Sequence, residues 1–134
     1  MSNDLQSFQK FMALRNDIAV AFVNGDAGPV LEITTNTPPF SFFGPKGGQE
    51  LDLARATASF SIDAAQFGQG ESQFDIAQLS ACDGLAFWLG VQRVEAKLVG
   101  KTETMQFNLR VTEVFKKSDE GWKMIHRHAD ALGH

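Results

Sequence analysis

The feature that most constrains the fold is a pair of long alternating segments near the C-terminal end. Apolar and polar residues alternate from Gln106 to Lys117 and again from Trp122 to Ala129, and a polar turn at residues 118–121 separates the two segments. Successive side chains of a strand point to opposite faces, so this alternation predicts two antiparallel strands joined by a hairpin. Any fold for this chain must therefore contain an antiparallel sheet.

One face of this predicted hairpin combines residue types that seldom share a plain core. The last strand places two histidines, a tryptophan and a methionine on one face, and the strand before it brings an asparagine and an arginine to the same wall. These residues are Trp122, Met124, His126 and His128 on the last strand, and Asn108 and Arg110 on the strand before it. Because polar and aromatic groups are mixed there, we expect this face to be the wall of a pocket.

The rest of the chain predicts helices first and strands afterwards. Apolar residues recur at helical spacing over residues 5–24, shorter helices are expected over 27–32 and 49–66, and a short apolar strand lies between them at 40–43. Alternating segments follow at 72–80 and 85–99, separated by the hairpin dipeptide Asp83-Gly84. This order predicts the α+β class, with three N-terminal helices packed on an antiparallel sheet.

Length and charge narrow the function classes. The 134 residues are enough for one domain, residues 1–134, and the net charge of −4 comes without a long basic run. Phosphate binding along a nucleic acid is therefore not expected. No apolar stretch reaches the roughly 20 residues that span a bilayer. The single cysteine, Cys82, excludes an intrachain disulfide and fits a reducing compartment. We expect a cytoplasmic protein with no membrane and no nucleic-acid partner.

Both faces of the long strands carry apolar side chains. Leu109, Val111 and Phe115 lie opposite the mixed face, although an antiparallel sheet usually exposes one face to water. The helices can cover only one face, so we expect a second copy of the chain to cover the other. The prediction is a homodimer packed through the outer face of the sheet.

Arg15 stands out in the first predicted helix because it falls within the apolar stripe. One interpretation is an arginine that reaches the edge of the helix or pairs with a buried carboxylate. The other is an anion-binding group at the mouth of a pocket. The sequence leaves both open.

Four segments carry a resemblance to a known family. The segments are Leu109-Arg110-Val111-Thr112-Glu113-Val114-Phe115 and Gly121-Trp122-Lys123-Met124-Ile125-His126-Arg127-His128, together with Phe22-Val23-Asn24-Gly25-Asp26 and Phe42-Phe43-Gly44-Pro45. In this order they resemble the SnoaL-like, ketosteroid-isomerase-like branch of the nuclear transport factor 2-like superfamily. The resemblance covers nearly the whole chain.

The resemblance implies a cone-shaped α+β barrel, in which a curved sheet wraps around a cavity that the helices close. Members of the family include isomerases, polyketide cyclases, dehydratases, epoxide hydrolases and non-catalytic binding modules, so the fold does not choose among them. The steroid isomerases use a tyrosine on the first helix, where this chain has Ile18, and an aspartate before a proline, where it has Gly44. The steroid-isomerase mechanism is therefore not expected.

The first functional hypothesis is a small cofactor-free isomerase, cyclase or dehydratase that acts on an apolar carbonyl compound. Alignment with the last strand of the family implies that His126 and His128 point into the cavity. Either imidazole would then abstract a proton alpha to the carbonyl, and Arg110 would stabilise the enolate.

The alternative is a binding module without chemistry, whose cavity is lined by Trp88, Phe42 and Met124. Asn108 and Arg15 would supply its polar contacts to a small apolar ligand. A metal is not expected, because the spacing His126-x-His128 supplies two ligands and the sequence places no third.

Overall fold

A computed structural model describes residues 3–133. Met1, Ser2 and His134, which the single-domain prediction includes, lie outside the described residues. The elements follow the order α1 (Asp4–Phe22), α2 (Gly28–Ile33), β1 (Ser41–Phe43), β2 (Gln49–Glu50), α3 (Leu53–Ala64), β3 (Phe67–Cys82), β4 (Leu85–Leu98), β5 (Met105–Ser118) and β6 (Gly121–Ala131). No helix within this range is long and apolar enough to cross a membrane.

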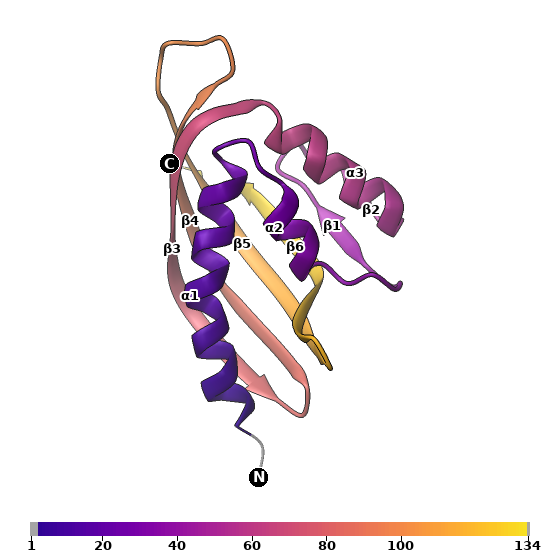
Figure 1. The fold of residues 1–134 in the computed structure, drawn as a ribbon. Helices are drawn as coiled ribbons and strands as arrows, with labels where there is room; N and C mark the ends of the chain where they lie inside the picture. The colour runs from indigo at the N-terminus through magenta and orange to yellow at the C-terminus, as the bar shows by residue number, and fades with distance from the viewer. Residues whose placement is uncertain (1–2, 134) are drawn as a thin grey trace.

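The six strands form one curved sheet in the order β2-β1-β6-β5-β4-β3. All neighbouring strands are antiparallel except β1 and β6, which run parallel. Figure 1 shows α1 lying along one face of this sheet, while α2 and α3 lie beside β1 and β6. The predicted α+β class, with three helices on a curved and mainly antiparallel sheet, is confirmed.

The third helix begins later than its apolar spacing predicts. Residues 49–50 form the short strand β2 instead of a first helical turn. Asp52 has an extended backbone, and its side-chain oxygen accepts a hydrogen bond of 2.9 Å from the backbone N–H of Arg55. This is an N-cap, which satisfies one of the free N–H groups at a helix start and fixes the boundary at Leu53.

Three β-bulges shape the sheet, two in β3 and one in β6. In β3 the pairing shifts between Ile76 and Gln78, which leaves Ala77 as an extra residue opposite Gly90 and Leu89 of β4. A Cβ on Gly90 would lie 2.1 Å from the backbone oxygen of Asp75, so only glycine fits there. Bulges bend a strand and increase its twist. This one therefore helps to curve the sheet around its inner face.

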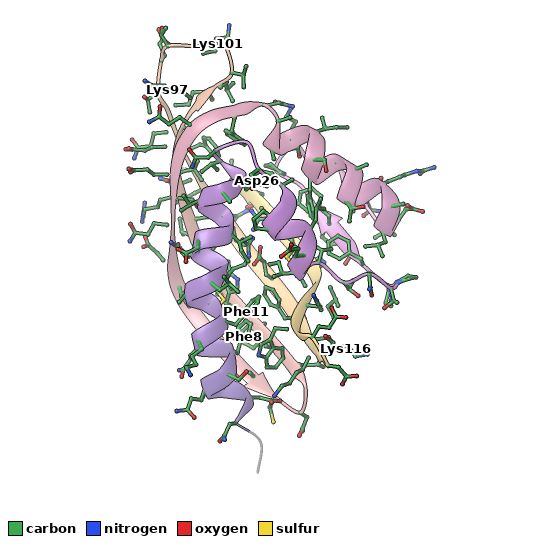
Figure 2. All side chains as sticks on the ribbon, in the orientation of Figure 1. Phe8, Phe11, Asp26, Lys97, Lys101 and Lys116 are labelled. Atoms are coloured by element: carbon green, nitrogen blue, oxygen red, sulfur yellow. The ribbon has the colours of Figure 1, made fainter. Side chains whose placement is uncertain are left out.

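An aromatic cluster fills one half of the inner face. Phe8 of α1 lies 5.3 Å from the ring of Phe115 on β5 and 5.4 Å from the ring of Trp122 on β6. Figure 2 labels Phe8 and Phe11 on the side of α1 that faces these strands. Burial of each such ring contributes on the order of 2–3 kcal/mol. A large cavity lies toward the other end of α1, where Arg15, Ala19 and Phe22 line it.

Candidate functional site

A cavity of about 460 Å³ lies between the second half of α1, α3, the loop from β1 to β2 and the inner face of the sheet. Its walls are mainly apolar, with phenylalanines from five different parts of the fold. These are Phe22, Phe42, Phe60, Phe67 and Phe107. A volume in this range and a mostly apolar lining are typical of small-molecule sites.

A buried cluster of three charged side chains lies at the deep end of this cavity. Arg15 of α1 donates two hydrogen bonds to Glu113 of β5, from Nε to Oε1 at 2.9 Å and from Nη2 to Oε2 at 2.8 Å. Arg127 of β6 donates to the same carboxylate from Nη1. Glu113 is fully buried, and both arginines line the cavity. Two guanidiniums thus hold one carboxylate.

Neutral side chains complete the hydrogen bonding of this cluster. The indole Nε1 of Trp88 donates to Glu113 Oε1 at 2.9 Å, which gives that carboxylate a fourth donor. Arg127 Nη2 donates to Gln92 Oε1 at 2.8 Å, and Gln92 Nε2 donates to Ser72 Oγ at 3.0 Å. The network links α1 to all four long strands and fixes the positions of both guanidiniums.

The charges of this network keep Glu113 ionised. Burial by itself would raise the pKa of this carboxyl group, but the charges of Arg15 and Arg127 and the hydrogen bonds outweigh it. The pKa falls from 4.5 to about 2. A carboxylate with this pKa and four donors is a poor proton acceptor at neutral pH, so Glu113 has a positioning role in the site.

The mouth of the cavity holds a second set of polar groups. Lys46 comes from the loop between β1 and β2, Gln49 is the first residue of β2, and Asp63 comes from α3. Burial raises the pKa of Asp63, while the charge of Lys46 opposes this shift. Burial therefore makes the carboxyl group of Asp63 easier to protonate than that of an exposed aspartate.

The two histidines do not face this cavity. In β6 the partner of Val114 is His126 and the partner of Phe115 is Met124, so Ile125 is an extra, bulged residue. Before the bulge Trp122 and Met124 point inward, as predicted. After it the alternation is reversed, and Arg127 points inward while His126 and His128 point outward.

The predicted catalytic residues lie together on the outer face of the sheet. His126 Nδ1 shares a hydrogen bond of 2.6 Å with Ser41 Oγ, and burial lowers the pKa of this histidine. His128 is exposed and lies 3.4 Å from an oxygen of Asp130. Arg110 is also exposed and donates two hydrogen bonds to Asp130. The prediction that His126, His128 and Arg110 point into the cavity is wrong.

The predicted binding residues divide between the two faces. Phe42 and Arg15 line the cavity, and Arg15 pairs with a buried carboxylate, which was one of its two interpretations. Trp88 and Met124 are fully buried on the inner face without lining the cavity, and Trp88 acts through its bond to Glu113. Asn108 lies on the outer face, because its neighbours Phe107 and Leu109 line the cavity.

Sequence reasoning missed Glu113, Arg127 and Gln92 as site residues. One signal for Glu113 was present, because it shares a strand face with Leu109, Val111 and Phe115. A carboxylate on an apolar face requires a buried cation. Arg15 in the apolar stripe of α1 was the matching signal. Within residues 3–133, no three His, Cys, Asp or Glu side chains are grouped so that they could hold a metal ion.

The model of the SnoaL-like domain family matches residues 12–131 of the chain. The protein belongs to this family, as the resemblance of its strands and its helix–sheet order indicated. A search of curated proteins found no match.

Solved structures with the same fold cover nearly the whole chain. A nuclear transport factor 2-like superfamily protein from Salmonella enterica serovar Typhimurium has a TM-score of 0.78 at 15% identity, covering 96% of this chain and 92% of its own. A candidate dehydratase of that family from Streptomyces avermitilis has a TM-score of 0.77 at 16% identity, with coverages of 96% and 97%.

A third similar structure is a candidate calcium/calmodulin dependent protein kinase II association domain from Xanthomonas campestris. Its TM-score is 0.76 at 16% identity, and the match covers 94% of this chain and 88% of the other. TM-scores of this size establish a common fold, and identities this low leave the function open.

Proposed function

We propose that this protein is a non-catalytic receptor for a small apolar molecule, which it holds in the cone-shaped cavity. The observation that carries the proposal is an apolar-walled cavity of about 460 Å³ from which the expected general bases are absent. His126 and His128 lie on the other face of the sheet, and Glu113 is held ionised by its cations. Binding then needs only apolar burial and a few fixed polar groups.

Two adjacent phenylalanines give a matched test of this function. Phe42 lines the cavity, whereas Phe43 lies on the opposite face with its ring 5.0 Å from that of His126. Compounds that copurify with the protein would be released by denaturation and identified by mass spectrometry. We expect Phe42→Ala to weaken their rebinding about tenfold, the effect of removing roughly 1.4 kcal/mol of apolar contact. Phe43→Ala should leave the affinity unchanged, and equal losses in both variants would contradict the proposal.

Asp63 supports a second candidate function, a cofactor-free isomerase, cyclase or dehydratase acting on a small carbonyl compound. Burial raises the pKa of this cavity carboxyl group, which brings it closer to the pH at which a general base works best. Asp63 would replace the histidines as the proton acceptor. If the protein is such an enzyme, Asp63→Asn will abolish turnover of a carbonyl ligand and retain its binding. In the receptor, the same variant changes affinity alone.

We also propose that two copies pack through the outer face of the sheet. Phe87, Leu89 and Val91 of β4 lie on that face beside Val114 of β5, and all four are only half-buried in the single chain. The similarity to a kinase association domain is consistent with self-association. Light scattering at micromolar concentration should give a dimer, and Leu89→Arg should give a monomer. A monomeric wild-type protein would refute this assembly.

A further inference from the structure

The charged cluster at the deep end of the cavity has an excess of positive charge. Arg15 and Arg127 carry two permanent positive charges, because a guanidinium stays protonated at every physiological pH. Glu113 supplies one negative charge, and the other side chains bonded to the cluster, which include Trp88 and Gln92, are neutral. The cluster therefore has a net charge of +1 at the inner end of an apolar cavity.

The hydrogen-bond count agrees with the charge count. A guanidinium has five N–H groups, and Arg15 uses Nε and Nη2 on Glu113. Its Nη1 is buried and has no hydrogen-bond partner among residues 3–133. Buried N–H groups in native proteins nearly always have a partner, and an unpaired one on a cation is the most costly kind. Arg15 also lines the cavity, so the missing acceptor is expected to come from a bound molecule.

We propose that this deep end is an anion site, and that the ligand is an apolar monocarboxylate whose carboxylate binds at Arg127 and Arg15. This inference rests on the receptor function proposed above. A planar carboxylate matches the geometry of guanidinium N–H groups, and one negative charge balances the excess of one positive charge. The phenylalanines of the lining, which include Phe42, Phe60 and Phe107, then contact the apolar body of the molecule.

Three probes of one shape test the charge requirement on the wild-type protein. They are 4-phenylbutyrate, 4-phenylbutyramide and 4-phenylbutanol, which differ only in the polar end. We expect the carboxylate to bind at least tenfold more tightly than the amide or the alcohol, measured by isothermal titration calorimetry at pH 7. Equal affinities would refute the anion site and leave the receptor function intact. Failure of all three to bind at millimolar concentration would refute the receptor function and the anion site together.

Two variants locate the anion within the cavity. Arg127→Gln removes a cation at the deep end, and Lys46→Gln removes the exposed cation at the mouth. The preference for carboxylate over amide should disappear in the first variant and persist in the second. The reverse result would place the anion at the mouth and overturn the proposal. Since the Arg127→Gln variant is also less stable, Arg127→Lys provides a second measurement, because it keeps the positive charge at the deep end and should retain the preference for carboxylate over amide.

Discussion

Replacing Glu113 by glutamine should destabilise the fold strongly, although the two side chains have nearly the same shape. The amide leaves the buried Arg15 and the part-buried Arg127 without a counter-charge, and breaking a buried pair in this way costs about 3–5 kcal/mol. The pKa shift of Glu113 gives an independent value for the same free energy. A shift from 4.5 to about 2 corresponds to about 3 kcal/mol of stability at neutral pH. The cost of breaking the buried pair and the free energy from the pKa shift agree, so a loss of about 3 kcal/mol is expected.

The pH dependence of this loss has a defined sign. The folded-state pKa of Glu113 is lower than the unfolded-state pKa, so its contribution is complete above pH 4.5 and disappears as the pH falls toward 2. Urea unfolding at pH 7 and at pH 3 measures this directly. The difference in free energy of unfolding between wild type and Glu113→Gln should shrink by about 2 kcal/mol at the lower pH.

Glu95→Gln on β4 is the matched control, because that carboxylate is exposed. Its effect should stay within about 0.5 kcal/mol at both pH values. A loss below about 1 kcal/mol for Glu113→Gln, or the same loss at pH 7 and pH 3, would show that the buried cluster does not stabilise the fold in the way described.

Three further substitutions or measurements follow from the fold and the outer face. Gly90→Ala should cost about 2 kcal/mol or more, seen as a lower Tm, because its Cβ would overlap Asp75, while Gly48→Ala has open space and should change little. Asp52→Ala removes the cap of α3 and should lower the free energy of urea unfolding by about 1 kcal/mol. The pH titration of His126 by NMR should have its midpoint below 6.5, since burial disfavours the charged imidazole; a midpoint above 6.5 would contradict its placement.

The fold class could be predicted because its signals are local. Helical spacing in α1 and strand alternation in β4, β5 and β6 each depend on neighbours only a few residues away, and hairpin turns such as Asp83-Gly84 mark the ends of strands. The start of α3 was predicted too early, at Gln49, because residues 49–50 instead pair with β1, which is a non-local contact.

The chemistry of the cavity could not be predicted in the same way. The sequence of β6 does not determine whether His126 and His128 or Arg127 face inward, because all three residues are polar. The choice is made by Glu113 on the neighbouring strand, which faces Arg127 across the pair. A buried carboxylate needs a cation, and only the bulged register supplies one from β6. The bulge at Ile125 thus turns both predicted catalytic side chains of β6, His126 and His128, to the outer face.

The bulge at Ile125 determines which side chains of β6 line the cavity, so the same sequence could give two different linings. In an unbulged β6, the two imidazoles would turn inward and the guanidinium of Arg127 outward, so two histidines would replace a permanent cation in the cavity lining. The buried carboxylate of Glu113 on β5 stabilises the bulged register, because it needs Arg127 as its partner. A related protein with an apolar residue in place of Glu113 would not need this register, so a substitution on β5 would change which side chains of β6 line the cavity.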